Sequence, residues 1–283
     1  MIETIMDKLK IIVCCHKDDI YAKSDIFLPV HVGKSLSSND LGMIGDDTGD
    51  HISVKNASYC ELTGMYWAWK NLKNVDYIGL CHYRRYFDFH HIGRRFFPLT
   101  TIKPEEFSSL DISISNKVKK WLKQGYCIVA RRSSLNMSLY LHYCEGHYSR
   151  DIRILGDVIR DNLSCEYFNA YWSIMVENNS FSPFNMFLMS WNQFDAYCNW
   201  LFPLLHEVEK RIDISNYPTD QKRIYGYMGE RLLNIYIKAR QLKVKQMPIL
   251  KISDDAEIDD ISTMKYIIRT LLRNVVFKLQ KCL

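Results

Sequence analysis

Short apolar runs recur along the chain and predict buried strands. Residues 8–15 are almost continuously apolar, which is typical of a central strand in a parallel sheet. Residues 26–32 are also extended, but Pro29 favours an edge position for them. Four further runs have the length and composition of strands: 75–81, 126–130, 184–189 and 244–249.

Helical periodicity separates these runs. Residues 58–72 carry an apolar stripe, and Ser58 with Glu61 three positions later predicts a capping box at the start of that helix. From 88 to 116 the pattern weakens and predicts a long irregular excursion. Further helices are expected over 151–162, 166–178, 192–211 and 224–240. The alternation of strands and helices predicts an α/β fold, with a mostly parallel sheet flanked by helices and a helical C-terminal part.

Composition narrows the class of protein. The 283 residues are 47% hydrophobic and 24% charged, which suits one large globular domain with an appendage. The net charge of +5 fits an anionic substrate or membrane surface and is too weak to indicate nucleic acid. The nine cysteines show no CxxC spacing, so reduced cytosolic thiols are expected. We expect no signal peptide before Lys8 and no membrane span.

The strand at 75–81 is followed at once by basic and aromatic side chains: His82, Tyr83, Arg84 and Arg85. Ligands bind at the carboxyl ends of strands in open α/β sheets, and paired guanidinium groups suit a phosphate or diphosphate. The alternative is a solvated turn whose arginines pair with surface carboxylates. His16 and Lys17 follow the first strand in the same way, and Lys55 with Asn56 precede the expected helix, where a backbone dipole favours anions.

The loop from Gly45 to Asn56 contains Asp46, Asp47 and Asp50. Three carboxylates so close together could bind a divalent cation or a ribose, although the spacing is not that of an EF-hand. Turn chemistry alone is the favoured explanation when the loop is taken by itself. A lone Asn185 in an apolar strand also needs a partner, which could be a ligand or a loop.

Together these residues resemble a bacterial family found in capsular polysaccharide and O-antigen gene clusters, formerly described as a domain of unknown function. The resemblance spans roughly 8–249 and rests on the segments at 45–71, 184–189 and 226–236, and on the specific string His-Tyr-Arg-Arg-Tyr-Phe at 82–87. Some members are similar to galactofuranosyltransferases. One stretch departs from the family: a Tyr-Asp strand with a basic, tyrosine-rich loop is expected where this chain has Gly-Tyr-Cys-Ile-Val-Ala-Arg-Arg at 125–132.

The resemblance implies a GT-A-like, Rossmann-related glycosyltransferase. His82 to Arg85 stand where such enzymes usually carry Asp-x-Asp, so cationic side chains replace the metal, and no metal or other cofactor is expected. Glu230, at the start of a late helix, would be the base that accepts the acceptor proton in an inverting transfer, with a helix-surface partner of Arg231 or Asn234 as the equal alternative. Asp47 and Asp50 compete for the catalytic role. Donor binding would fall to His16, Lys17, Lys55, Asn56, His82, Tyr83, Arg84 and Arg85, and acceptor binding to Asn185 and Arg231.

The expected function is transfer of a sugar, with galactofuranose as a candidate, from a UDP-linked or similar nucleotide donor to a surface polysaccharide or lipid-linked glycan. The alternatives are a non-catalytic nucleotide- or glycan-binding subunit and, more weakly, a phosphotransferase, for which no P-loop is present. We expect a transferase domain at 8–250, an acidic linker at 251–263 and a basic amphipathic helix at 264–283. That helix would either lie on an anionic membrane surface, pack on the core or form a dimer contact, so the protein would be cytoplasmic or peripheral on the inner membrane face.

Overall fold

The structure is a computed structural model that describes residues 8–93, 96–254 and 262–281. The chain divides into two compact units. The described residues of unit 1 fall within Met1–Arg131, Met186–Cys198 and Lys243–Asp260, and those of unit 2 within Arg132–Asn185, Asn199–Leu242 and Ile261–Leu283. Each unit is therefore assembled from separate stretches of sequence.

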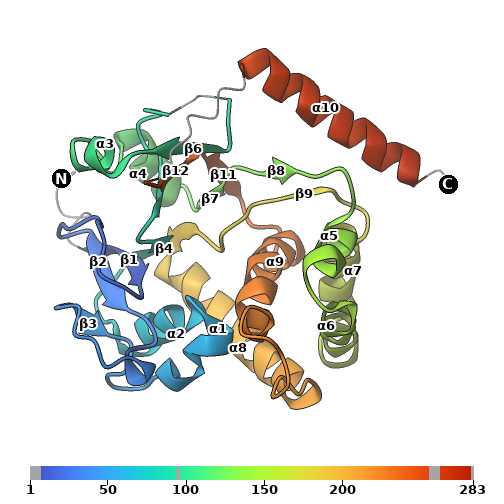
Figure 1. Cartoon of the computed structure of the whole chain (residues 1–283), viewed down its shortest axis with the longest axis horizontal. Coiled ribbons are helices and arrows are strands. Elements are labelled where there is room, and N and C mark those ends of the chain that lie inside the picture. Colours follow the sequence, from blue (N-terminus) through green and yellow to red (C-terminus); the bar gives the residue numbers. More distant parts are fainter. Residues whose placement is uncertain (1–7, 94–95, 255–261, 282–283) are drawn as a thin grey trace. The chain divides into compact units, whose positions relative to one another are not determined.

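Unit 1 contains a 10-stranded mixed sheet (Figure 1). Its main path runs β11-β7-β10-β4-β1-β2-β3, and β5, β12 and β6 extend from β4. Strands β3, β2, β1 and β4 are mutually parallel, whereas β10 is antiparallel to both β4 and β7. The bounds are β1 Leu9–Cys15, β2 Phe27–His31, β3 Ile44–Gly45, β4 Tyr77–His82, β5 Arg85–Phe87, β6 Leu99–Ile102, β7 Cys127–Ala130, β10 Phe187–Ser190, β11 Val244–Met247 and β12 Ile249–Ile252.

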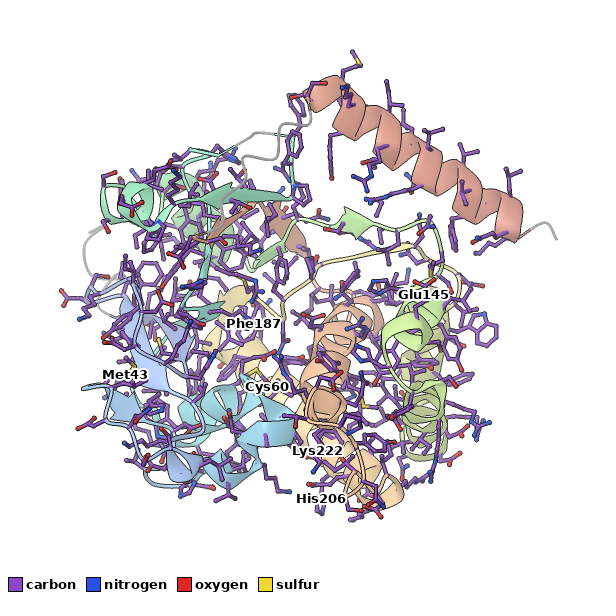
Figure 2. The ribbon with its side chains drawn as sticks, viewed as in Figure 1. Met43, Cys60, Glu145, Phe187, His206 and Lys222 are labelled. Atoms are coloured by element: carbon purple, nitrogen blue, oxygen red, sulfur yellow. The ribbon has the colours of Figure 1, made fainter. Side chains whose placement is uncertain are left out.

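The core of unit 1 follows from the apolar runs. In β1, Ile11 and Val13 have no exposed surface, as expected for a strand paired on both sides and covered on both faces. Phe187, labelled in Figure 2, is equally buried on β10. A Cβ atom on Gly79 of β4 would lie 3.0 Å from the Phe187 carbonyl oxygen, so glycine lets the two strands approach closely.

Short helices flank this sheet. They are α1 Asn56–Tyr59, α2 Leu62–Asn71, α3 Pro104–Ser108, α4 Asn116–Lys123 and the first residues of α8 Trp191–Arg211. Helix α2 packs on β1, and an added Cβ on Gly64 would lie 3.4 Å from Cys14 Sγ of β1 and 2.7 Å from Val32 Cγ1, just after β2. The α/β class and the mostly parallel sheet flanked by helices are thus confirmed.

Three expectations about local structure are wrong. The helix over 58–72 is broken at Cys60, and Ser58 donates its hydroxyl to the Lys55 carbonyl instead of capping a helix. The stretch 88–116 is not wholly irregular, because it contains β6 and α3. Strand β2 is not an edge, since it lies between β1 and β3; the two residues of β3 pair only with its last two, which leaves Pro29 unpaired on that side.

Unit 2 is mainly helical. It contains α5 Leu139–Gly146, α6 Ser149–Asn162, α7 Cys165–Met175, most of α8, α9 Ile224–Ala239 and α10 Thr263–Gln280, with a two-stranded ribbon of β8 Ser133–Ser134 and β9 Ser180–Phe181 (Figure 1). Helix α7 packs on α6 and α9. The helical C-terminal part is confirmed. Most of the acidic stretch expected as a linker, 255–261, lies outside the described residues.

Candidate functional site

The candidate site in unit 1 is built where the parallel strands end. Because β3, β2, β1 and β4 run the same way, their carboxyl ends share one edge of the sheet, where ligands bind in open α/β folds. The register pairs Cys14 with His82, and His31 with both Cys15 and Gly45. The residues that follow these strands therefore come together, although they lie far apart in the sequence.

Four of the expected donor-binding residues gather at this edge. The rings of His16 and Tyr83 meet edge to face, with centroids 5.2 Å apart. The Lys17 Nζ atom lies 6.0 Å from the Tyr83 ring centroid, and the Arg84 guanidinium carbon lies 5.9 Å from it. One aromatic ring is thus surrounded by an imidazole and two cationic groups.

Arg84 has carboxylate partners of its own. Its Nε atom donates to Asp19 Oδ2 at 2.8 Å, and its Nη2 atom lies 2.8 Å from Asp19 Oδ2 and 3.0 Å from Asp254 Oδ2. Partial burial opposes ionisation of Asp19, but the hydrogen bonds from Arg84 and the Ile20 amide lower its pKa overall. Arg84 therefore has the carboxylate partners expected of a solvated turn, which is the alternative to an anion site.

A second cationic group lies across β4, β5 and β12. Arg85 begins β5, where the antiparallel register places it opposite His82 on one side and Lys251 on the other. Directly opposed residues share a face of the sheet, and like charges in that position are destabilising. The register thus brings His82, Arg85 and Lys251 into one row across the three strands.

Contrary to the sequence prediction, Lys55 and Asn56 do not lie before a long helix. Helix α1, which begins at Asn56, has only four residues. The Asn56 amide donates to the Cys60 carbonyl at 2.8 Å and to Thr63 Oγ1 at 2.9 Å, so its donors serve the turn between α1 and α2. The Lys55 Nζ atom lies 5.5 Å from the centroid of the Tyr59 ring.

The aspartates after β3 have different surroundings. Asp46 is fully buried, and its carboxylate accepts hydrogen bonds from the Gly33 amide at 2.9 Å, from the Lys34 amide at 3.1 Å and from the Ser53 hydroxyl. It therefore serves the loop itself, as turn chemistry predicts.

The two catalytic candidates of this loop are more accessible. Asp50 is exposed and accepts a hydrogen bond from the Tyr66 hydroxyl at 3.2 Å. Asp47 is half-buried, and its Oδ1 atom occupies the space that a Cβ on Gly45 would need. Among the residues that the structure describes, no group of three or more His, Cys, Asp or Glu side chains could hold a metal ion.

In unit 2, Glu230 lies on α9 with both carboxylate oxygens engaged. Oε1 accepts a hydrogen bond from the Phe184 amide at 3.2 Å, and Oε2 lies 3.1 Å from Arg231 Nη1. Glu230 is 25% exposed, whereas Arg231 is only 4% exposed and lies over the rings of Tyr143 and Phe181 at 5.3 and 5.5 Å. The partnership of Glu230 with Arg231, the alternative to a catalytic role, is thus present in the structure.

Asn185 directly follows Phe184, whose amide donates a hydrogen bond to Glu230. Phe184 and Asn185 both have positive φ, 72° and 52°, which is costly for residues other than glycine. One turn along α9, Asn234 holds Ser182 through both its amide oxygen and its amide nitrogen, each at 2.9 Å. Asn185 is fully buried, and neither its Oδ1 nor its Nδ2 atom has a hydrogen-bond partner among the described residues. Buried amides are normally satisfied, so this one is a candidate for a ligand.

Two residues at this edge of unit 1 are not identified as site residues by the sequence pattern. His31 is 2% exposed at the end of β2, and its Nδ1 atom has no partner in the part of the chain that the structure describes. Its position at a strand end, like those of His16 and His82, was the available signal. Lys251 had no such signal, because only the pairing of β12 with β5 places it opposite Arg85.

No helix in the described ranges is long and apolar enough to cross a membrane. A search of curated proteins gave no match. Among solved structures, the chain is similar to an apo structure of the WbbM bifunctional glycosyltransferase, with a TM-score of 0.79 and 32% sequence identity. The similarity covers 87% of this chain and 46% of the other, so this chain spans a little under half of that protein.

A protein-family comparison gives the classification. The family described as Domain of unknown function (DUF4422) matches residues 10–241, which is most of the 283-residue chain and includes the sheet edge, Asn185 and Glu230. The chain therefore belongs to the DUF4422 family.

Proposed function

We propose that this protein is a glycosyltransferase that moves a sugar from a nucleotide donor onto a surface polysaccharide or a lipid-linked glycan. The observation that carries the proposal is the cluster of His16, Lys17, Tyr83 and Arg84 at the carboxyl edge of the parallel strands. It lies in a fold that resembles, over 87% of this chain, part of a glycosyltransferase. The proposed transferase domain is GT-A-like and spans 8–250, with 264–283 as an appended helix.

The donor diphosphate would bind over the basic groups of this edge. Guanidinium and ammonium groups form charge-assisted hydrogen bonds to phosphate oxygens, and they can stabilise the charge that develops on a departing nucleoside diphosphate. The opposed Arg85 and Lys251 support this assignment, because they add two basic side chains on adjacent strands. We propose a UDP-linked donor, with galactofuranose as the first sugar to test, and a transfer that needs no metal.

Glu230 is our proposed general base in an inverting transfer. Its side chain is 25% exposed, so an acceptor hydroxyl could reach the carboxylate from solvent. The unpartnered Asn185 amide offers a donor and an acceptor side by side, which suits neighbouring hydroxyls of a sugar. Arg231 would act by holding Glu230. Asp47 and Asp50 are the competing bases.

One observation favours the alternative of a non-catalytic nucleotide- or glycan-binding subunit. The Glu230 carboxylate and the Arg84 guanidinium both have partners within their own unit, as they would in a protein that only binds. Release of nucleoside diphosphate distinguishes the two functions, because a binding subunit does not consume its ligand.

The test is a panel of nucleotide sugars, with calorimetric binding and released nucleoside diphosphate measured on the same samples. We expect one donor to bind and turn over. Lys251→Gln should weaken its binding roughly 5- to 50-fold through loss of a phosphate contact. Lys123→Gln, at the exposed end of α4, is the matched control and should bind normally. Equal donor binding by both variants would show that the row of Arg85 and Lys251 is not part of the donor site.

A further inference from the structure

Helix α10 carries its apolar side chains outward. Eight of them are between 38% and 66% exposed: Met264, Ile267, Ile268, Leu271, Leu272, Val275, Val276 and Leu279. Their spacing forms a single stripe along the helix. An exposed apolar stripe of this length marks a surface that contacts another apolar phase.

The opposite face of α10 is fastened to unit 2 through mostly polar side chains. Arg273 Nη1 donates to the Ser134 carbonyl at 3.1 Å, and Asn274 Oδ1 accepts from Asn179 Nδ2 at 2.8 Å. Lys281 Nζ donates to the Glu177 carbonyl at 2.8 Å, and Phe277 is the one buried residue assigned to this helix. Figure 1 shows α10 beside β8, with which it is in contact. Packing of the apolar stripe on the core of unit 2 is therefore not what the structure shows.

The charges on α10 indicate what would cover the stripe. Residues 262–281 contain no acidic side chain, and Lys265, Arg269 and Lys278 are exposed. A second copy of the same helix would bring these like charges close together, which is unfavourable. An anionic bilayer would accept the apolar residues in its interface and attract the basic ones.

Two of the residues that bind the inner face of α10 belong to the same segment as the candidate acceptor residue Asn185. Asn179, which Asn274 holds, also donates to the Leu135 carbonyl at 2.7 Å. Three residues later Asn234 holds Ser182, and Glu230 holds the Phe184 amide. The segment 177–185 is thus tied to α10 at one end and to α9 at the other.

We propose that the outward face of α10 is a docking surface for an anionic lipid bilayer, and that α10 holds the segment 177–185 at that surface. The docking does not depend on the proposed activity. Its consequence for a lipid-linked acceptor does rest on that activity: the segment that carries Asn185 would be presented where such an acceptor is anchored.

The experiment measures sedimentation of the full chain with vesicles of phosphatidylcholine alone and with added phosphatidylglycerol, without any turnover. Leu272→Glu and Gln280→Glu each add one negative charge to an exposed position of α10, but only Leu272 lies on the stripe. We expect the wild type to sediment with the anionic vesicles only. Leu272→Glu should weaken this binding about tenfold or more relative to Gln280→Glu, with unchanged circular dichroism for both.

Three results would overturn the docking proposal. The first is that the wild type does not bind anionic vesicles at low salt, and the second is that the two variants bind equally well. The third is a dimer in sedimentation velocity that Leu272→Glu dissociates, which would identify a second copy of the chain as the occupant. A separate variant tests whether α10 holds the segment 177–185. Asn274→Ala should bind vesicles normally but show faster amide hydrogen exchange over 179–184, and unchanged exchange would contradict the link between α10 and that segment.

Discussion

At the scale of single residues, Arg84 is held between Asp19 and Asp254, and its side chain is 29% exposed. Removing it would leave Asp19, whose side chain is only 11% exposed, without its main partner. Lys17 Nζ, 3.6 Å from Asp19 Oδ2, would remain as a weaker partner. Arg84→Ala should therefore lower the free energy of unfolding by about 1 kcal/mol, less than the full cost of an unpaired buried group.

A double-mutant cycle with Asp19→Asn separates this structural role from ligand binding. The coupling between the two residues should be about 1 kcal/mol in urea denaturation, given their partial exposure. If Arg84→Ala leaves the stability unchanged but abolishes donor binding, Arg84 is a ligand residue first and the bonds to Asp19 and Asp254 are incidental.

Glu230 is the residue on which transfer would depend most. Glu230→Gln keeps an oxygen that can accept from the Phe184 amide but loses the negative charge beside Arg231. We expect the fold and donor binding to persist while kcat falls by about 10²–10⁴-fold, as for loss of a general base. Stopped assays of sugar transfer at saturating donor measure this, and near-normal turnover would move the role to Asp47 or Asp50.

The sequence predicted residues at strand ends better than residues brought together by pairing. His16, Lys17 and Tyr83 were identifiable because polar residues follow apolar runs, and parallel strands bring such positions to one edge. Lys251 and Asp254 were not identifiable, because their neighbours Arg85 and Arg84 are distant in sequence and only the β12–β5 register joins them. The separate surroundings of Asp46 and Asp50 also depend on tertiary contacts that spacing does not contain.

At the scale of elements, the long periodic segments were predicted closely and the junctions were not. The apolar runs became β1, β4 and β7, whereas β5 has only three residues and gives no pattern of its own. The break between α1 and α2 comes from Cys60, with φ 51° and ψ −129°. Four hydrogen bonds, among them one from Thr63 Oγ1 to the Cys60 carbonyl, hold that residue there against its local preference. Cys60 is labelled in Figure 2.

That junction gives a prediction about stability. The backbone conformation of Cys60 is one that glycine adopts readily and other residues adopt at a cost of roughly 1–3 kcal/mol. Cys60→Gly should therefore be more stable than Cys60→Ala by about 1 kcal/mol or more in thermal unfolding, the reverse of the usual order for these residues in a helix. If the alanine variant is the more stable, the strain is not present in solution.

At the scale of the whole molecule, the residue pattern predicts the α/β class but not the division into two units. Each unit draws on three separate stretches of chain, and α8 contributes to both, so no linker in the sequence marks the boundary. The basic edge belongs to unit 1, while Asn185, Glu230 and α10 belong to unit 2. The proposed activity is therefore best tested on the full chain.

The most direct test of the proposed transfer is mass analysis of an acceptor glycan after incubation with the full chain and the donor that it binds, in excess EDTA. We predict that the acceptor gains the mass of one sugar, that EDTA does not reduce the yield, and that Glu230→Gln nearly abolishes it. Donor that binds without any glycosylated product would contradict a transferase and favour the binding subunit. A product that disappears with EDTA and returns with manganese or magnesium would contradict the cationic replacement of the metal.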